Sequence, residues 1–184
     1  MTFKPPPPIE SPRLLLRIVQ EADIAGLMAV NGDDEVTRFL PYATWKSLAD
    51  GKAWFERMAA MGAKGCARQF VMVEKASGSV IGTCLLFRHD EGSARAELGY
   101  VLGRAHWRQG FMQEALPALI GCAFNDCALR RLEAEVEPDN VASNRLLVSQ
   151  GFVHEGLLRK RWVSKGVARD THIYGLLKDE WPAA

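Results

Sequence analysis

Residues 107–115 read Trp-Arg-Gln-Gly-Phe-Met-Gln-Glu-Ala, and this stretch decides the fold. Gly110 gives the backbone the freedom to bring amide N–H groups close to a ligand. Apolar side chains then recur at the spacing of a helix with one buried face, at Met112, Ala115, Leu116, Leu119, Ile120, Ala123 and Phe124. A glycine loop that leads into a helix N-terminus favours anions, because unpaired N–H groups and the helix dipole point outward together. Since Arg108 adds a positive charge, the segment predicts a pyrophosphate site.

Strand patterns lie on both sides of this helix. Residues 95–102 alternate, with Ala96, Leu98, Tyr100 and Leu102 on one face and Glu97, Gly99 and Val101 on the other. A second strand is predicted over residues 131–137. In the segment that follows, Asn140 is placed to cap a short helix and Gly151 to end it. The order is therefore strand, loop, helix, strand, helix.

This order resembles the acetyl-coenzyme A core of the GNAT-type N-acetyltransferase superfamily. In that family a bulged strand runs into a pyrophosphate loop of pattern (Gln/Arg)-x-x-Gly-x-(Gly/Ala), and an Asn-initiated helix later ends in Gly-Phe. Asn140 and the Gly-Phe of residues 151–152 lie at the family's spacing. Further features look like the branch that includes the ribosomal-protein alanine and serine N-acetyltransferases (RimJ and RimL): Ser-Pro-Arg-Leu-Leu-Leu-Arg at residues 11–17, Asp23, Trp162, Asp170 and Tyr-Gly-Leu-Leu at residues 174–177.

The resemblance and the remaining patterns imply an α/β fold. We expect a mixed, mostly antiparallel sheet of about seven strands, with helices on both faces and the acetyl-CoA core in the middle. One domain is expected over residues 1–184, with residues 1–10 as a flexible proline-rich leader. Other strands are predicted at residues 13–18, 70–74, 80–87, 153–163 and 168–177, and helices at residues 23–30, at 34–39 and after Ser47.

The resemblance also implies where acetyl-CoA, the expected co-substrate, binds. The candidate contacts are Tyr100, Val101, Leu102, Arg108, Gln109, Gly110, Phe111, Met112, Gln113 and Asn140. A bulge at residues 99–101 is expected to free backbone N–H groups for the pantetheine amides and the thioester carbonyl. Two positions depart from the family's loop, since Trp107 replaces Gln or Arg and Met112 replaces Gly or Ala. Met112 still supplies a backbone N–H, so we expect binding to survive.

Acetyl transfer to an amine also requires a base for the amine and an acid for the departing thiolate. Glu97 is the candidate base, acting through a water; its alternative reading is a solvated or salt-bridged strand carboxylate. Many family members carry a tyrosine acid where this chain has Leu147. The nearest hydroxyl is that of Ser143, which is either the acid, an anchor for the thiol or only a capping residue. Tyr100 is interpreted as a packing residue.

The composition of the chain limits the classes of molecule that the protein is expected to bind. The chain has 184 residues, 48% of them hydrophobic, and a formal net charge of +1, so no overall charge favours nucleic acid or a membrane. The four cysteines show no Cys-x-x-Cys spacing, and the N-terminus has no apolar signal segment, so a cytoplasmic enzyme is expected. The histidines show no metal-ligand spacing, so no metal is predicted. His172 is interpreted as a surface or core histidine, with an acceptor-facing position as the alternative.

The leading hypothesis is an N-acetyltransferase that moves an acetyl group from acetyl-CoA to a primary amine by direct attack in a ternary complex. The acceptor is a protein N-terminal α-amine or a small-molecule amine, held near residues 32–50 and 159–170. Trp45, Trp54 and Trp162 are either walls of that pocket or core residues. A non-catalytic coenzyme A sensor is the alternative, while another nucleotide-binding class is disfavoured by the lack of its glycine motifs. The resemblance allows a homodimer.

Overall fold

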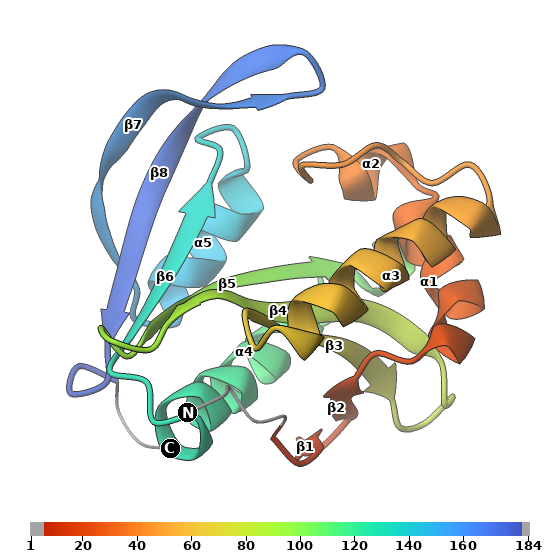
Figure 1. The fold of residues 1–184 in the computed structure, drawn as a ribbon, viewed down its shortest axis with the longest axis horizontal. Helices are drawn as coiled ribbons and strands as arrows, with labels where there is room; N and C mark the ends of the chain where they lie inside the picture. The colour runs from red at the N-terminus through yellow and green to blue at the C-terminus, as the bar shows by residue number, and fades with distance from the viewer. Residues whose placement is uncertain (1–5, 182–184) are drawn as a thin grey trace.

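The computed structural model describes residues 6–181, which form one eight-stranded sheet with helices on both faces (Figure 1). The strand order is β1-β2-β3-β4-β5-β6-β8-β7. Within the described residues β5 and β6 run parallel, and the other neighbouring strands run antiparallel. The strands are β1 (Ile9–Glu10), β2 (Leu14–Ile18), β3 (Ala67–Glu74), β4 (Val80–Asp90), β5 (Arg95–Leu102), β6 (Arg131–Val136), β7 (Val153–Ser164) and β8 (Val167–Leu177).

Five α-helices cover the sheet unequally. They are α1 (Ile24–Asn31), α2 (Asp34–Thr37), α3 (Leu48–Ala63), α4 (Phe111–Gly121) and α5 (Val141–Ser149). Helices α1 and α3 pack on β4 and β3 on one face, with α2 beside α1, and α4 and α5 lie on the opposite face (Figure 1). No helix within residues 6–181 is long and apolar enough to cross a membrane.

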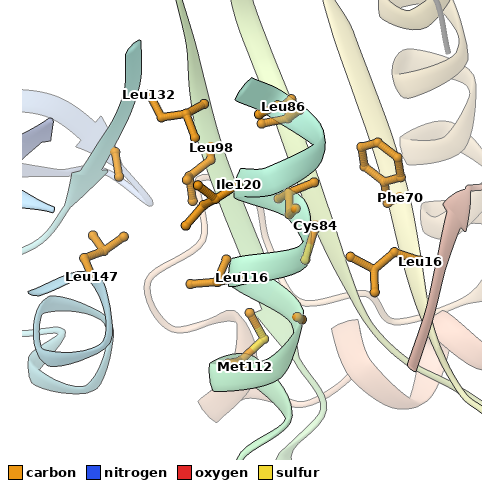
Figure 2. Close-up of a cluster of buried hydrophobic side chains, with 14 of the residues drawn as sticks. Leu16, Phe70, Cys84, Leu86, Leu98, Met112, Leu116, Ile120, Leu132 and Leu147 are labelled. Carbon is orange, nitrogen blue, oxygen red and sulfur yellow. The ribbon is translucent and has the colours of Figure 1, made fainter. Parts of the chain in front are cut away.

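Each face of the sheet has its own hydrophobic core. On the α4 face, Leu116 and Ile120 pack among side chains of the central strands, and Leu147 of α5 joins the same cluster (Figure 2). On the other face, Trp45 and Trp54 pack against each other with ring centroids 5.6 Å apart. The alternating pattern of β5 is confirmed, because Ala96, Leu98 and Leu102 enter the α4 core while Val101 enters a separate cluster.

The predicted α/β fold is confirmed, with one strand more than expected. Ile9 and Glu10 pair with Leu16 and Leu15 as the short strand β1. The expected flexible leader is therefore wrong at its last two residues, because antiparallel pairing with β2 orders them. Residues 1–5 lie outside the described residues.

Helix α4 keeps its predicted amphipathic face despite the proline inside it. Pro117 lies in its second turn, and the helix continues to Gly121. It then widens into a π-helical turn over residues 122–126, in which the Cys127 N–H donates to the Cys122 carbonyl at 3.0 Å. Nothing in the sequence predicted this turn, and nothing in the structure gives Pro117 a function.

The parallel strands β5 and β6 pair with each other only at their N-terminal ends and then diverge. Their pairing covers three residue pairs and ends where Glu97 meets Glu133. Beyond this point β5 stays paired with β4 as far as Leu102, while β6 stays paired with β8 as far as Val136. The second half of β5 therefore has a paired neighbour on one side only.

The bulge expected at residues 99–101 is wrong. Pairing with β4 is regular from Glu97 to Leu102, and the irregularity lies in β4, between Phe87 and Asp90. The strand gap arises instead because β5 and β6 each follow a longer antiparallel partner in a different direction. The gap supplies what the bulge was expected to supply, namely backbone groups of β5 that no neighbouring strand occupies.

Candidate active site

The loop before α4 has the geometry of an anion site. Gly110 has φ +80° and is the N-cap of α4, and Arg108 also has positive φ at +60°. The first helical hydrogen bond runs from the Glu114 N–H to the Gly110 carbonyl at 3.1 Å. Since the earlier N–H groups of a helix have no intrahelical acceptor, those of residues 111–113 are available to a ligand.

The two departures from the family's loop have structural explanations. The side chain of Met112 is buried in the α4 core, so it does not stand in the way of a ligand at the backbone (Figure 2). The Trp107 indole Nε1–H donates to the Leu102 carbonyl at 2.7 Å. Trp107 therefore fastens the loop to the end of β5. Beside it, the Gln109 side chain donates to the Ala105 carbonyl at 2.8 Å.

Two predicted residues meet across the gap beside β5. The Tyr100 hydroxyl lies 2.6 Å from the Ser143 Oγ, and either oxygen can be the donor. Asn140 caps α5 as predicted, because its side chain accepts the Ser143 N–H at 3.2 Å. Leu147 is fully buried in the core. The hydroxyl groups that meet at the gap are thus those of Ser143 on α5 and Tyr100 on β5.

Tyr100 packs against the α4 core, as interpreted from the sequence, and its hydroxyl also makes a polar contact. Burial raises the pKa of its phenol, while the hydrogen bond with Ser143 opposes the rise, so the group is protonated at neutral pH. Its partner Ser143 lies 43 positions away in the chain. The sequence pattern placed Tyr100 on a buried strand face, which explains the packing interpretation, but it carried no sign of the hydroxyl pair.

Glu97 lies on the opposite face of β5 in an ion-pair cluster. Its carboxylate is buried, with 7% of the residue exposed, and accepts from Arg88 Nη1 at 2.6 Å. The same Nη1 lies 3.3 Å from a carboxylate oxygen of Glu135 on β6. Burial raises the pKa of Glu97 to about 7, while the charge of Arg88 opposes the rise and that of Glu135 adds to it. Glu97 therefore changes charge near neutral pH, as a base for an amine must.

Side chains of the β7–β8 hairpin border the Glu97 cluster. Trp162 donates its indole N–H to Glu135, and the Arg88 guanidinium lies over the Trp162 ring at 4.9 Å from the centroid. At the hairpin tip, Lys165 Nζ donates to the Thr37 carbonyl of α2 at 2.8 Å. The two segments named as acceptor loops from the sequence, residues 32–50 and 159–170, thus meet in space.

Of three other residues proposed for the acceptor pocket, two are buried in the α1–α3 core and one lies on the opposite face of the sheet from Glu97. Trp45 and Trp54 are each 3% exposed and belong to the α1–α3 core, as the packing interpretation predicts. His172 lies on the α5 side of the sheet, where its Nδ1 is 3.0 Å from the Asn144 side-chain oxygen. It does not face Glu97. Trp162, which is 42% exposed, is the one tryptophan of the three that borders the cluster.

The two faces of strand β5 carry different chemical groups. The phosphate loop, the hydroxyl pair and α5 lie on one face of β5, and Glu97 with its ion pairs lies on the other. Within residues 6–181 no group of three or more His, Cys, Asp or Glu side chains could hold a metal ion.

Comparison with known proteins agrees with this geometry. The family model for an acetyltransferase (GNAT) domain matches residues 13–153, which include β2, the phosphate loop and α5. The chain belongs to the GNAT acetyltransferase family. This acetyltransferase is 37% identical over 169 residues to the N-acetyltransferase p20 of Bacillus licheniformis, covering 92% of this chain and 95% of the relative.

The RimJ and RimL branch is represented among the relatives of this GNAT protein. The ribosomal-protein-serine acetyltransferase of Escherichia coli is 29% identical over 116 residues, covering 63% of this chain and 64% of the relative. The structure of Mycobacterium smegmatis RimJ in complex with CoA-disulfide superimposes with a TM-score of 0.86 at 23% identity, covering 97% of this chain and 89% of RimJ. The last comparison shows the shared fold.

Proposed function

We propose that this acetyltransferase moves an acetyl group from acetyl-CoA to a primary amine by direct attack in a ternary complex. The observation that carries the proposal is the buried Glu97 carboxylate, whose pKa lies near 7, on the strand that also carries Tyr100. A base and an acid on opposite faces of one strand suit a reaction in which an amine loses a proton and a thiolate gains one.

In the proposed reaction, Glu97 removes a proton from the acceptor ammonium, directly or through a water. The free amine nitrogen then attacks the thioester carbonyl carbon, forming the new C–N bond. When the C–S bond breaks, the thiolate takes a proton from the hydroxyl pair of Tyr100 and Ser143, and the second proton that the attacking nitrogen loses on becoming an amide replaces it through solvent. The capping residue of α5 is Asn140, which accepts the Ser143 N–H, so the Ser143 hydroxyl is proposed as a partner of the acid or an anchor for the thiol.

Acetyl-CoA is proposed to bind along the gap beside β5. The N–H groups of residues 111–113 and the charge of Arg108 are suited to its pyrophosphate. Backbone groups of Tyr100, Val101 and Leu102 that face the gap are suited to the pantetheine arm, and the Asn140 side chain lies at its edge. Much of the rate enhancement would come from aligning the two reactants.

The role of Glu97 is tested by Glu97→Gln, which keeps the shape of the side chain and removes its basicity. We expect kcat/KM to fall at least about tenfold, while the Kd for CoA measured by calorimetry stays within about twofold of the wild-type value. Glu155→Gln is the matched control, because Glu155 is an ion-paired strand carboxylate on β7, bound to Arg131, and should leave kcat/KM within about twofold of the wild-type value. Equal rates in wild type and Glu97→Gln remove Glu97 as the base.

The pH profile tests the same role independently. Glu97 acts as a base only when ionised, and its ionised fraction rises through a pKa of about 7. We therefore expect kcat/KM to climb between about pH 6 and 8 in the wild type. In Glu97→Gln that limb should disappear, leaving the limb due to the amine itself. A limb unchanged by the substitution contradicts the assignment.

The acceptor is proposed to be a protein N-terminal α-amine or a small-molecule amine. The similarity to a ribosomal-protein-serine acetyltransferase supports the first class, and the half-exposed Trp162 beside Glu97 offers an apolar wall to either. Thiol release from acetyl-CoA should be measured against short peptides with different first residues, polyamines, amino acids and aminoglycosides. Turnover with one class identifies the acceptor. The proposal also places the enzyme in the cytoplasm, supported by its four free cysteines.

A coenzyme A sensor is the alternative function. It is favoured by the fully buried Leu147, where many relatives carry a tyrosine acid. Tight CoA binding with no thiol release across the whole panel would support the sensor. Release with any member of the panel would exclude it.

A further inference from the structure

The opening sequence motif meets the phosphate loop across the start of α4. Ser11 Oγ donates to Glu114 Oε1 at 2.7 Å, and the Arg13 backbone N–H donates to the same oxygen at 2.6 Å. Arg13 Nε donates to the other carboxylate oxygen at 2.6 Å. Three donors from residues 11–13 therefore converge on one carboxylate in the first turn of α4.

The Arg13 side chain continues from Glu114 onto the loop itself. Its Nη1 donates to the Gln109 carbonyl at 3.0 Å, and its guanidinium lies 4.4 Å from the centroid of the Phe111 ring. Its Nη2 faces Gly110, because a Cβ built on Gly110 would lie 3.5 Å from that nitrogen. One side chain thus touches three consecutive residues at the point where the loop becomes a helix.

The charge of Glu114 makes this contact significant for anion binding. A carboxylate in the first turn of a helix is attracted by the helix dipole, but it also repels a phosphate at the same terminus. Burial would raise the pKa of Glu114, yet hydrogen bonds from Ser11 and Arg13 hold it below its usual value, so the group is ionised at neutral pH. The guanidinium of Arg13 is the cation that offsets this charge at the loop.

We propose that Arg13 is a positioning residue of the coenzyme A site, which holds residues 109–111 in their N–H-outward conformation and offsets the charge of Glu114 beside the pyrophosphate. The inference rests on the proposed function, because it takes the loop as the pyrophosphate site. It gives the Ser-Pro-Arg motif at residues 11–13 a role that the sequence did not suggest. Arg17, the second arginine in the longer segment of residues 11–17, has a different role, because it pairs with Asp23 at 2.7 Å.

Calorimetric titration with CoA tests the inference without any need for turnover. We expect Arg13→Gln to raise the Kd about tenfold, and Arg13→Lys to raise it less, because lysine keeps the charge but cannot donate to Glu114 and Gln109 together. Lys75→Gln is the matched control, because Lys75 pairs with Glu10 at 2.9 Å at the same edge of the sheet, and its Kd should stay within about twofold of wild type.

A double variant tests whether Arg13 offsets the charge of Glu114. In Arg13→Gln/Glu114→Gln the unbalanced carboxylate is gone, so part of the lost CoA affinity should return relative to Arg13→Gln. No recovery overturns the neutralising role of Arg13. Thermal melts of all variants show whether each is folded at the titration temperature.

A donor that lacks phosphates separates positioning of the loop from general damage. For Arg13→Gln, kcat/KM should fall about tenfold with acetyl-CoA and change less than about twofold with S-acetylpantetheine. Equal losses with the two donors, or a CoA Kd equal to that of wild type, overturn the inference while leaving the proposed function intact. Failure of the wild-type protein to bind CoA overturns the proposed function and this inference with it.

Discussion

The hydroxyl pair of Tyr100 and Ser143 is the feature that matters most at the scale of single residues. Tyr100→Phe removes the phenolic proton and keeps the ring, so we expect kcat to fall about tenfold or more with little change in CoA affinity. Ser143→Ala should have a smaller effect on kcat, because the phenol remains. The measurement is steady-state turnover together with CoA titration.

Tyr174→Phe is the matched control for this prediction. Tyr174 is also buried on the α5 side of the sheet, but its hydroxyl donates to the Asn144 side-chain oxygen at 2.7 Å and not to Ser143. Its loss should leave kcat within about threefold of wild type. If the two phenylalanine variants lose turnover equally, Tyr100 has no special part in proton transfer.

Residue types and their spacing identified most of the candidate site, but pairings across the sheet were beyond them. The capping role of Asn140 could be predicted from helix-start chemistry, whereas strand alternation gave only the face of Glu97 and the resemblance gave its role as candidate base. The contacts of Tyr100 with Ser143 and of Arg13 with Glu114 join residues 43 and 101 positions apart, respectively. Local periodicity carries no information on which distant side chains a sheet brings together.

At the scale of elements, the loop and α4 depend on the left-handed conformation of Gly110. An alanine at φ +80° is strained, so Gly110→Ala should lower the free energy of unfolding by about 1–2 kcal/mol. A Cβ there would make only an ordinary contact with Arg13, so we expect CoA affinity to fall several-fold because the loop shifts to relieve the backbone strain. Chemical denaturation and CoA titration measure the two effects separately.

Gly78→Ala separates strain from function. Gly78 has φ +70° in the turn between β3 and β4, and a Cβ there would meet nothing within 4 Å. It should lose similar stability and keep the CoA affinity of wild type. An equal loss of affinity in both glycine variants would mean that stability alone limits binding.

Element boundaries followed from the sequence wherever periodicity was strong. The predicted strand at residues 95–102 is observed with the same bounds, and the turn near residues 164–166 joins β7 to β8. The pattern missed β1, because two residues cannot show alternation, and it missed the π-helical turn, which depends on how α4 ends against the sheet. The bulge, inferred from resemblance, was wrong because pairing with β4 keeps β5 regular.

At the scale of the whole molecule, stability rests on two cores that share one sheet. Leu119→Ala removes a fully buried side chain from the α4 core and should lower the free energy of unfolding by about 2–5 kcal/mol. If the chain is one domain, as its length predicts, the α1–α3 core with Trp45 and Trp54 must melt in the same transition. Urea unfolding followed by tryptophan fluorescence and by far-UV circular dichroism should then give coincident curves. Separate midpoints for the two signals would contradict a single cooperative unit.

The parting of β5 and β6 has a mechanical consequence for the whole sheet. Only three residue pairs join a block of strands β1 to β5 to a block of β6, β8 and β7, so the two large blocks of the sheet are narrowly connected. A pantetheine arm lying between β5 and β6, the seam of the sheet, would connect the two blocks of strands as an extra strand does. Amide hydrogen exchange at residues 98–102 and 134–136 should therefore slow together when CoA is added, on both sides of the seam.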